Sequence, residues 1–162
     1  MTRIAGIDPG RDGAIVVLQD GAIYKYTLLR ACIPKLFLLD HGVRTVYIEK
    51  AQPMGRESSK AMFNYGREYG FLLGTLSGSG LDVNFVPPAV WTGALHKKAP
   101  MTFSNPKEAS LYVARQLWPD QNFLATERSR VPHDGVVDAA LIAYYGGVYV
   151  KERKSSAGFS QE

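Results

Sequence analysis

The sequence predicts an α/β fold in which a central, mixed, five-stranded sheet is flanked by helices on both faces. Two observations predict it. Three apolar segments of strand length open the chain, with short turns between them, and later apolar strand-like segments alternate with helical ones. The first pattern is typical of an antiparallel meander, and the second of parallel strands joined by helices. With 162 residues, the chain is long enough to bury the core of one such domain.

The first three strands are expected at residues 2–8, 13–18 and 22–28, where apolar and β-branched residues predominate. Asp20 and Gly21 lie between the second and third strands, and Asp-Gly is a strong signal for a tight hairpin turn. We therefore expect these three strands to pair antiparallel in chain order.

Helices and strands alternate in the middle of the chain. In order, we expect a short helix, a buried strand, a turn-rich loop, a long helix and a strand at residues 31–41, 45–49, 50–58, 58–76 and 82–86. The long helix is expected despite three glycines. Pro87 and Pro88 end the last of these strands, because proline cannot donate to a strand ladder.

The last third of the chain reads as helical. We expect a short helix, a basic loop, a helix, a polar loop and a final helix at residues 89–95, 96–104, 106–117, 120–132 and 133–150. Asn105 is expected to cap the middle helix, with Pro106 in the favoured first turn. Residues 1–150 would then form one domain, followed by a polar flexible tail at residues 151–162.

Composition limits the class of protein. The formal net charge of +4 is compatible with a nucleic-acid partner, although many basic proteins bind none. Cys32 is the only cysteine, so no internal disulfide can form, which fits a reducing compartment. No apolar run approaches the roughly 20 residues that span a bilayer. Arg3 and Asp8 interrupt the apolar core that a signal peptide needs, so we expect a cytoplasmic protein without membrane contact.

Four acidic residues stand out by context. Asp8 ends the first predicted strand, Glu49 ends the fourth, and Asp134 and Asp138 lie at the start of the last helix. Taken singly, Asp8 is better explained as a turn residue, Glu49 as a surface charge and Asp134 as a helix cap. Asp138 is harder to explain in this way, because it lies on an apolar helix where an unpaired charge is costly to bury.

Together the four acids suggest a metal site. The spacing of Asp134 and Asp138 places both on one helical face. Separate elements would thus supply only carboxylate oxygens, which suit Mg²⁺ or Mn²⁺ rather than Zn²⁺. Two such ions about 4 Å apart support in-line hydrolysis of a phosphodiester.

Five segments, taken in order, resemble the RuvC-type Holliday junction resolvases of the RNase H-like nuclease superfamily. They are most similar to the phage-encoded and organellar branch. The segments are GIDPGRDGAI, YIEKAQPMGRESSKAMFNYGREYGFLLGTL, VPPAVW, KEASLYVARQLWP and HDGVVDAALIAYYGG. The likeness covers nearly the whole chain. The first motif alone is loose, whereas the ordered set is specific.

The resemblance implies an RNase H-like fold and a metal-dependent DNA endonuclease. Such an enzyme would resolve four-way (Holliday) junctions by paired, symmetric phosphodiester hydrolysis, which leaves 5′-phosphate and 3′-hydroxyl ends. It further implies two Mg²⁺ or Mn²⁺ ions per active site, a homodimer, branched DNA as the partner, and no nucleotide cofactor.

The resemblance also carries residue roles. The residues that match the family's metal-binding catalytic acids are Asp8, Glu49, Asp134 and Asp138. Lys107 matches a lysine that could contact the scissile-strand phosphate, with a solvated helix start as the alternative. For His133, a capping or surface role and a role near the metal both stay open. Thr92 and Val136 depart from the family, which often has Lys and Arg at these places.

Further residues are expected to contact DNA or a second copy of the chain. Basic residues around the acids are the DNA-binding candidates, namely Lys50, Arg56, Lys60, Arg67, Lys97, Lys98, Lys107, Arg128 and Arg130. Met54 and Phe63 are candidates for a wedge at an open junction, with the core as the alternative for Phe63. The long helix is the expected dimer interface, through Gly66, Gly70, Phe71 and Gly74.

Three other functions compete with a strict resolvase. A broader nuclease that debranches DNA would use the same acids, and the sequence does not separate the two. A non-catalytic DNA-binding protein of the same fold is disfavoured by the intact acidic set. Actin-like ATPases open with a similar acidic strand end, but they need two such domains to enclose a nucleotide.

Overall fold

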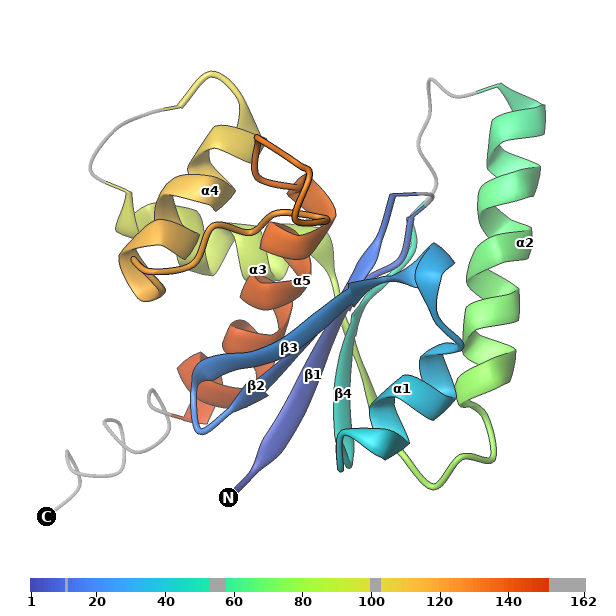
Figure 1. Cartoon of the computed structure of the whole chain (residues 1–162). Helices are drawn as coiled ribbons and strands as arrows, with labels where there is room; N and C mark the ends of the chain where they lie inside the picture. Colours follow the sequence, from blue (N-terminus) through green and yellow to red (C-terminus); the bar gives the residue numbers. More distant parts are fainter. Residues whose placement is uncertain (11, 53–57, 100–102, 152–162) are drawn as a thin grey trace, which may run out of the picture.

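The structure is a computed structural model that describes residues 1–10, 12–52, 58–99 and 103–151. A five-stranded sheet with the order β3-β2-β1-β4-β5 forms its centre (Figure 1). The strands, in chain order, are β1 (Arg3–Asp8), β2 (Ala14–Gln19), β3 (Ala22–Leu28), β4 (Thr45–Glu49) and β5 (Asp82–Val86). The first three pair antiparallel, whereas β4 pairs parallel with both β1 and β5. The predicted mixed sheet is confirmed.

Turn chemistry explains how the meander begins. Asp20 and Gly21 both have positive φ angles, 51° and 88°, as a tight hairpin between β2 and β3 requires. Gly13 lies outside β2, contrary to the prediction, because it passes so close to the backbone of Asp8 that a side chain there would overlap it. The strand therefore starts one residue later.

Helices cover both faces of the sheet, as predicted (Figure 1). On one face lie α1 (Pro34–Asp40) and α2 (Ser59–Leu76). The other face carries α3 (Pro88–Leu95), α4 (Pro106–Leu117) and α5 (Asp134–Tyr144). Among the described residues, no helix is both long enough and apolar enough to cross a membrane. The tail from residue 152 onwards lies outside the described residues.

Alternation along the strands divides the apolar side chains between two cores. Ala5, Ile7 and Ile48 pack towards α1 and α2. Ile4, Val16 and Leu18 point to the opposite face of the sheet and pack towards α5. Residues of β1 with even numbers therefore face α5, and Asp8 is one of them.

Some helix bounds differ from the predictions. The helix predicted at residues 31–41 begins only at Pro34, which occupies the first helical turn, and a 3₁₀ turn (Leu29–Ala31) precedes it. The predicted basic loop begins with a 3₁₀ turn, His96–Lys98, that continues from α3. Asn105 caps α4 by accepting a hydrogen bond from the backbone N–H of Lys107, as expected.

The last helix changes its winding. It was predicted to run from residue 133 to 150, but the α-helix ends at Tyr144 and a π-helical turn spans Tyr145–Tyr149. Gly146 lies against the ring of Tyr47 and Gly147 against Ile4, so a side chain at either glycine would overlap the sheet. The wider turn lets the backbone follow the sheet at this close distance.

The approach of α5 to β1 depends on Gly6. A methyl group at this position would overlap the carbonyl oxygen of Ala139 and the amide nitrogen of Ala143. Ala139 and Ala143 themselves carry small side chains that are completely buried. Helix and strand backbones are thus nearly in contact along the line that leads to Asp8.

We expect Gly6→Ala to lower the free energy of unfolding by about 3 kcal/mol, since overpacking a rigid core typically costs 1–3 kcal/mol and backbone atoms cannot rotate away. Thermal unfolding followed by circular dichroism measures the loss. Gly93→Ala, at a helical glycine with open space around it, is the matched control and should be neutral or slightly stabilising. Equal melting temperatures for both variants would contradict the close approach.

Candidate active site

Two acids lie side by side where parallel strands end. The registered pair Ile7 and Ile48 of β1 and β4 directly precedes Asp8 and Glu49. Side chains alternate between the two faces along a strand. Asp8 follows Ile4 by four residues and Glu49 follows Tyr47 by two, so both acids lie on the face that α5 covers, as Ile4 and Tyr47 do. The carboxyl ends of parallel strands are where α/β sheets present functional groups.

Helix α5 adds the other two acids. Gly135, in its first turn, lies so close to the backbone of Asp12 and the carboxylate of Asp8 that a side chain there would meet both. Asp138 follows one turn later and faces inward. Asp134 is the first residue of α5, and its side chain is 55% exposed. The structure therefore brings all four predicted acids together, three of them in a sheltered gap and one at its rim.

Burial, reinforced by neighbouring carboxylates, governs the ionisation of Asp8. Burial, and then the charges of Asp138 and Glu49, raise the pKa of Asp8 to about 8. Burial likewise raises the pKa of Asp138 to about 6, against a hydrogen bond from Ser110 that lowers it. These carboxylates interact strongly, so they titrate as a group and hold protons that ordinary surface acids would have lost.

Specific donors hold the remaining acids. The indole N–H of Trp91 donates to Oε2 of Glu49 over 2.8 Å, which opposes the rise that burial causes in the pKa of Glu49. The ammonium of Lys107 pairs with Asp134 at the rim, and this hydrogen bond raises the pKa of Lys107. The carboxylate of Asp12 pairs with Arg30 over 3.5 Å instead and takes no part in this cluster of acids.

Sequence analysis missed four residues of this site. Trp91 is buried, and its indole N–H donates to Glu49. Ser110 and His96 form a hydrogen bond of 3.1 Å behind Asp138. Tyr65 of α2 lies close enough to the acids that burial, with the charges of Glu49 and Asp8, raises its pKa to about 12. The general rule that a buried indole N–H needs an acceptor was the one available signal.

The acids fit divalent cations. Their donor set consists of carboxylate oxygens, the hard ligands that Mg²⁺ and Mn²⁺ prefer, and a cation would relieve the repulsion that raises the pKa of Asp8. In the described part of the chain, no three His, Cys, Asp or Glu side chains yet stand close enough to hold one ion. His133 caps α5 only through its backbone, and its buried Nδ1 has no hydrogen-bond partner in the described structure.

The predicted DNA-binding residues lie in different settings. Those that are described are all exposed, namely Lys50, Lys60, Arg67, Lys97, Lys98, Lys107, Arg128 and Arg130. The ammonium of Lys98 stands 4.8 Å from the ring centre of Tyr149 and 5.4 Å from that of Tyr144. It is therefore drawn towards the far end of α5. Val136 is completely buried, so no phosphate contact is available at this departure from the family pattern. Arg56 and Met54 lie outside the described residues.

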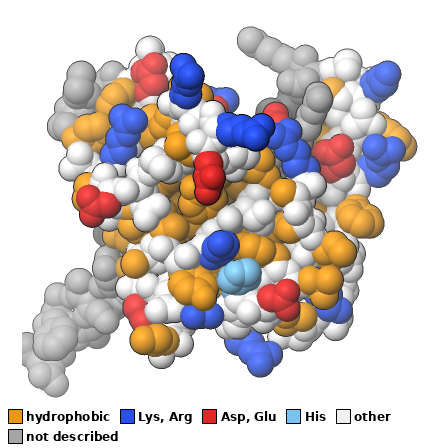
Figure 2. Space-filling view, viewed as in Figure 1, with side chains coloured by type: hydrophobic (Ala, Val, Ile, Leu, Met, Phe, Trp, Pro, Cys, Tyr) orange, Lys and Arg blue, Asp and Glu red, His pale blue; other side chains and the backbone are white. Residues whose placement is uncertain are grey.

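The outer face of α2 is apolar and open. Phe63 is 70% exposed and Phe71 73% exposed, so the core alternative for Phe63 is wrong. Among the described residues, and apart from the backbone of α2 itself, no atom lies within 4 Å of the side-chain positions of Gly66, Gly70 and Gly74. Figure 2 shows hydrophobic side chains in the hollow between the α2 side and the α4–α5 side, with Lys and Arg side chains along its upper rim.

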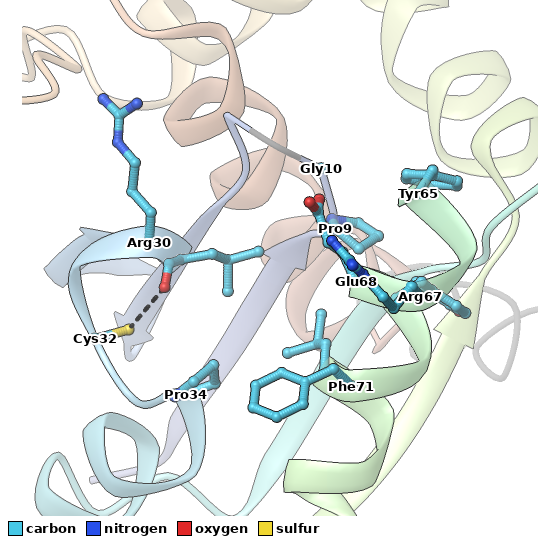
Figure 3. A pocket seen from close by; sticks show the side chains of 12 residues that line it. Pro9, Gly10, Arg30, Cys32, Pro34, Tyr65, Arg67, Glu68 and Phe71 are labelled. Atoms are coloured by element: carbon cyan, nitrogen blue, oxygen red, sulfur yellow. Dashed lines mark hydrogen bonds between the residues drawn. The ribbon is translucent and has the colours of Figure 1, made fainter. Parts of the chain in front are cut away.

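A cavity of about 630 Å³ opens between α2 and the turn that follows Asp8 (Figure 3). Pro9 and Gly10 form one wall, and Tyr65 and Phe71 of α2 form the other. Tyr65 lines this cavity and also lies near the acids, since the charges of Glu49 and Asp8 add to the burial that raises its pKa. Arg67 and Glu68 add charge at its edge, so an apolar recess adjoins the polar site.

Comparisons with known proteins show the fold. Neither a scan against protein-family models nor a search of curated proteins finds a match. Among solved structures, Thermus thermophilus RuvC in complex with a Holliday junction substrate aligns with a TM-score of 0.65 at 18% identity. The alignment covers 94% of this chain and 96% of that one. A second structure of Thermus thermophilus RuvC aligns with a TM-score of 0.60 at 19% identity, covering 93% and 96%.

The fold is therefore the RNase H-like α/β fold, with strand order and helix placement as expected. More particularly, it is the version found in RuvC, over nearly the full length of both chains. The resemblance seen in the motifs is confirmed at the level of the fold. Membership of the phage-encoded and organellar branch stays a prediction.

We expect the metal-free protein to lose stability as the pH rises from about 5 to 8. The pKa of Asp8 is about 8 in the folded chain, against an ordinary value of 3.8, so the folded state binds more protons and the free energy of unfolding falls across this range. Asp8→Asn removes the ionisable group, so at pH 8 its free energy of unfolding should exceed that of the wild type by about 2 kcal/mol. Its melting temperature should therefore be several degrees higher.

Differential scanning calorimetry in EDTA from pH 5 to 9 checks this expectation. Asp12→Asn, at an exposed acid outside the site, is the matched control and should follow the wild-type curve. Parallel curves for Asp8→Asn and the wild type would contradict the buried, crowded setting of Asp8.

Proposed function

We propose that the protein is a metal-dependent, structure-selective DNA endonuclease that resolves four-way junctions by paired hydrolysis of symmetric phosphodiesters. One observation carries the proposal. Asp8, Glu49 and Asp138 come from three separate elements and meet at the end of a sheet with the RuvC fold, where burial raises the pKa of each and the charge of Glu49 raises the pKa of Asp8 and Asp138 further. The same fold without these acids could bind DNA but would have no groups to catalyse its hydrolysis.

Each acid has a role in this proposal. Asp8, Glu49 and Asp138 would hold two Mg²⁺ or Mn²⁺ ions, with Asp134 completing the set from the rim. When bound, the ions would activate water and stabilise charge on the leaving 3′ oxygen, which yields 5′-phosphate and 3′-hydroxyl ends. The protein itself orients the carboxylates through Trp91 and Ser110 and shelters them under α5.

Lys107 would neutralise the scissile phosphate. Its ammonium pairs with Asp134 in the DNA-free protein and is otherwise exposed, so the same cation is available at the rim of the site. A phosphate entering there would compete with Asp134 for Lys107. Exposed Lys50, Lys60, Arg128 and Arg130 are proposed to contact more distant phosphates, which would make binding salt-dependent.

Two copies of the chain would pair through α2. The open stripe of Gly66, Gly70 and Gly74 permits a close helix contact, and Phe71 supplies exposed apolar area beside it. A two-fold dimer would present two active sites to a substrate that is itself two-fold symmetric. Phe63 precedes the first glycine of the stripe, Gly66, by one helical turn. It would remain exposed and could insert between bases at the junction centre.

Cleavage of labelled DNA tests the activity. With Mg²⁺, the protein should nick a four-way junction symmetrically and leave duplex and flap DNA intact; EDTA should stop the reaction. Asp8→Asn should abolish cleavage but retain junction binding in a gel-shift assay, because it removes a ligand oxygen's charge without changing the size of the side chain. Equal cutting of all three substrates would indicate a debranching nuclease. No metal-dependent cutting of any substrate would refute the enzyme.

Sedimentation velocity tests the dimer. We expect the wild type to be dimeric and Gly70→Gln to be monomeric, because the added side chain fills the open stripe while glutamine favours the helix more than glycine does. The variant should release single nicks instead of resolved products. Gly93→Gln, on an exposed helical position of α3, should remain dimeric. A monomeric wild type at micromolar concentration would count against pairing through α2.

A further inference from the structure

A chain of contacts runs behind the acids, and none of its members touches the open site. His96 lies in the 3₁₀ turn after α3, and its Nε2 is 3.1 Å from the hydroxyl of Ser110. Ser110 lies in α4, is only 4% exposed, and hydrogen-bonds to Asp138. The ring of His96 also meets the ring of Trp91 edge to face, with centroids 5.9 Å apart. Trp91 in turn donates to Glu49.

Chemistry fixes the direction of these hydrogen bonds. The bond from Ser110 lowers the pKa of Asp138, so the hydroxyl donates its only hydrogen to the ionised carboxylate. The hydroxyl can then only accept from His96, whose Nε2 must carry hydrogen. Burial lowers the pKa of His96, so its ring is neutral and holds that hydrogen on Nε2. The relay is therefore ordered from His96 to Ser110 to Asp138.

We propose that His96 is a positioning residue that fixes the carboxylates of Asp138 and Glu49 for divalent-ion binding, by orienting the hydroxyl of Ser110 and bracing the indole of Trp91. The inference rests on the proposed function, because it concerns how that site is prepared for its ions. His96 itself makes no contact with DNA or ions in this arrangement.

Two features of the site make such a device necessary. The described acids do not yet form an ion cage, and they repel one another, so their side chains would turn apart without fixed donors. Asp138 and Glu49 lie on different elements, α5 and β4, and the α3–α4 segment supplies a hydrogen-bond donor to each of them. Residues that orient metal ligands from behind commonly contribute about 10- to 100-fold to metal affinity.

Calorimetric titration of the DNA-free, full-length protein with Mn²⁺ alone tests the proposal. His96→Ala should weaken Mn²⁺ binding roughly tenfold or more. His96→Gln, whose amide N–H₂ can reach the position of Nε2, should restore affinity to within about threefold of the wild type. The double variant with Ser110→Ala should bind no more weakly than either single variant, because both changes break the same relay.

His41→Ala is the matched control. His41 is also half-buried, makes one ring hydrogen bond and packs on two aromatic rings, but it does so at the end of α1, away from the acids. It should lower the melting temperature about as much as His96→Ala and leave Mn²⁺ affinity unchanged.

The outcomes separate the two proposals. Wild-type affinity in folded His96→Ala, an equal loss in His41→Ala, no rescue by His96→Gln, or additive losses in the double variant would each overturn the positioning role while leaving the nuclease intact. A wild type that binds no Mn²⁺ and cuts no junction would overturn both. Weakened ion binding in His96→Ala, with unchanged junction affinity and rescue by glutamine, would support the relay.

Discussion

The site depends on the near-contact between α5 and β1. Because Gly6 has no side chain and Ala139 and Ala143 have small ones, the helix lies directly on the strand backbone. Asp8 ends that strand and Asp138 belongs to that helix, so the closeness of the two backbones sets the spacing of the two acids. Gly135 continues the contact to the carboxylate of Asp8 itself. A looser helix would leave the same acids in the sequence but would separate them in space.

Holding carboxylates this close carries an electrostatic cost that the fold distributes over several groups. A proton remains on the site near neutral pH, as the pKa of about 8 of Asp8 indicates, and neutral donors oppose part of the rise in the pKa of Glu49 and Asp138. Lys107 supplies the only positive charge that the described salt bridges bring to an acid of the site. A divalent cation would displace the bound proton. The repulsion between the carboxylates therefore favours the binding of cations.

Much of the fold and of the acidic site could be predicted from sequence, for physical reasons that differ between elements. The strands at 22–28, 45–49 and 82–86 have their predicted bounds because turns and prolines mark their ends. The acids could be placed because a strand end fixes where a side chain emerges. His96 and Ser110 could not, since their meeting depends on how α3 and α4 pack together. The π-helical turn could not be predicted either, because the need for glycine at positions 146 and 147 arises only from their contacts with Tyr47 and Ile4 in the folded chain.

The glycine stripe of α2 has a consequence for folding as well as for pairing. Each helical glycine disfavours the helix by about 1 kcal/mol relative to alanine, so Gly66, Gly70 and Gly74 together lower the intrinsic stability of α2. If a second copy covers this stripe, the order of the helix is coupled to association. Protein concentration then becomes a regulator: dilute chains would have a loosened α2, and Tyr65 beside the acids would lose its support. Encounter of two copies on one branch point would assemble the interface and both active sites at the same time.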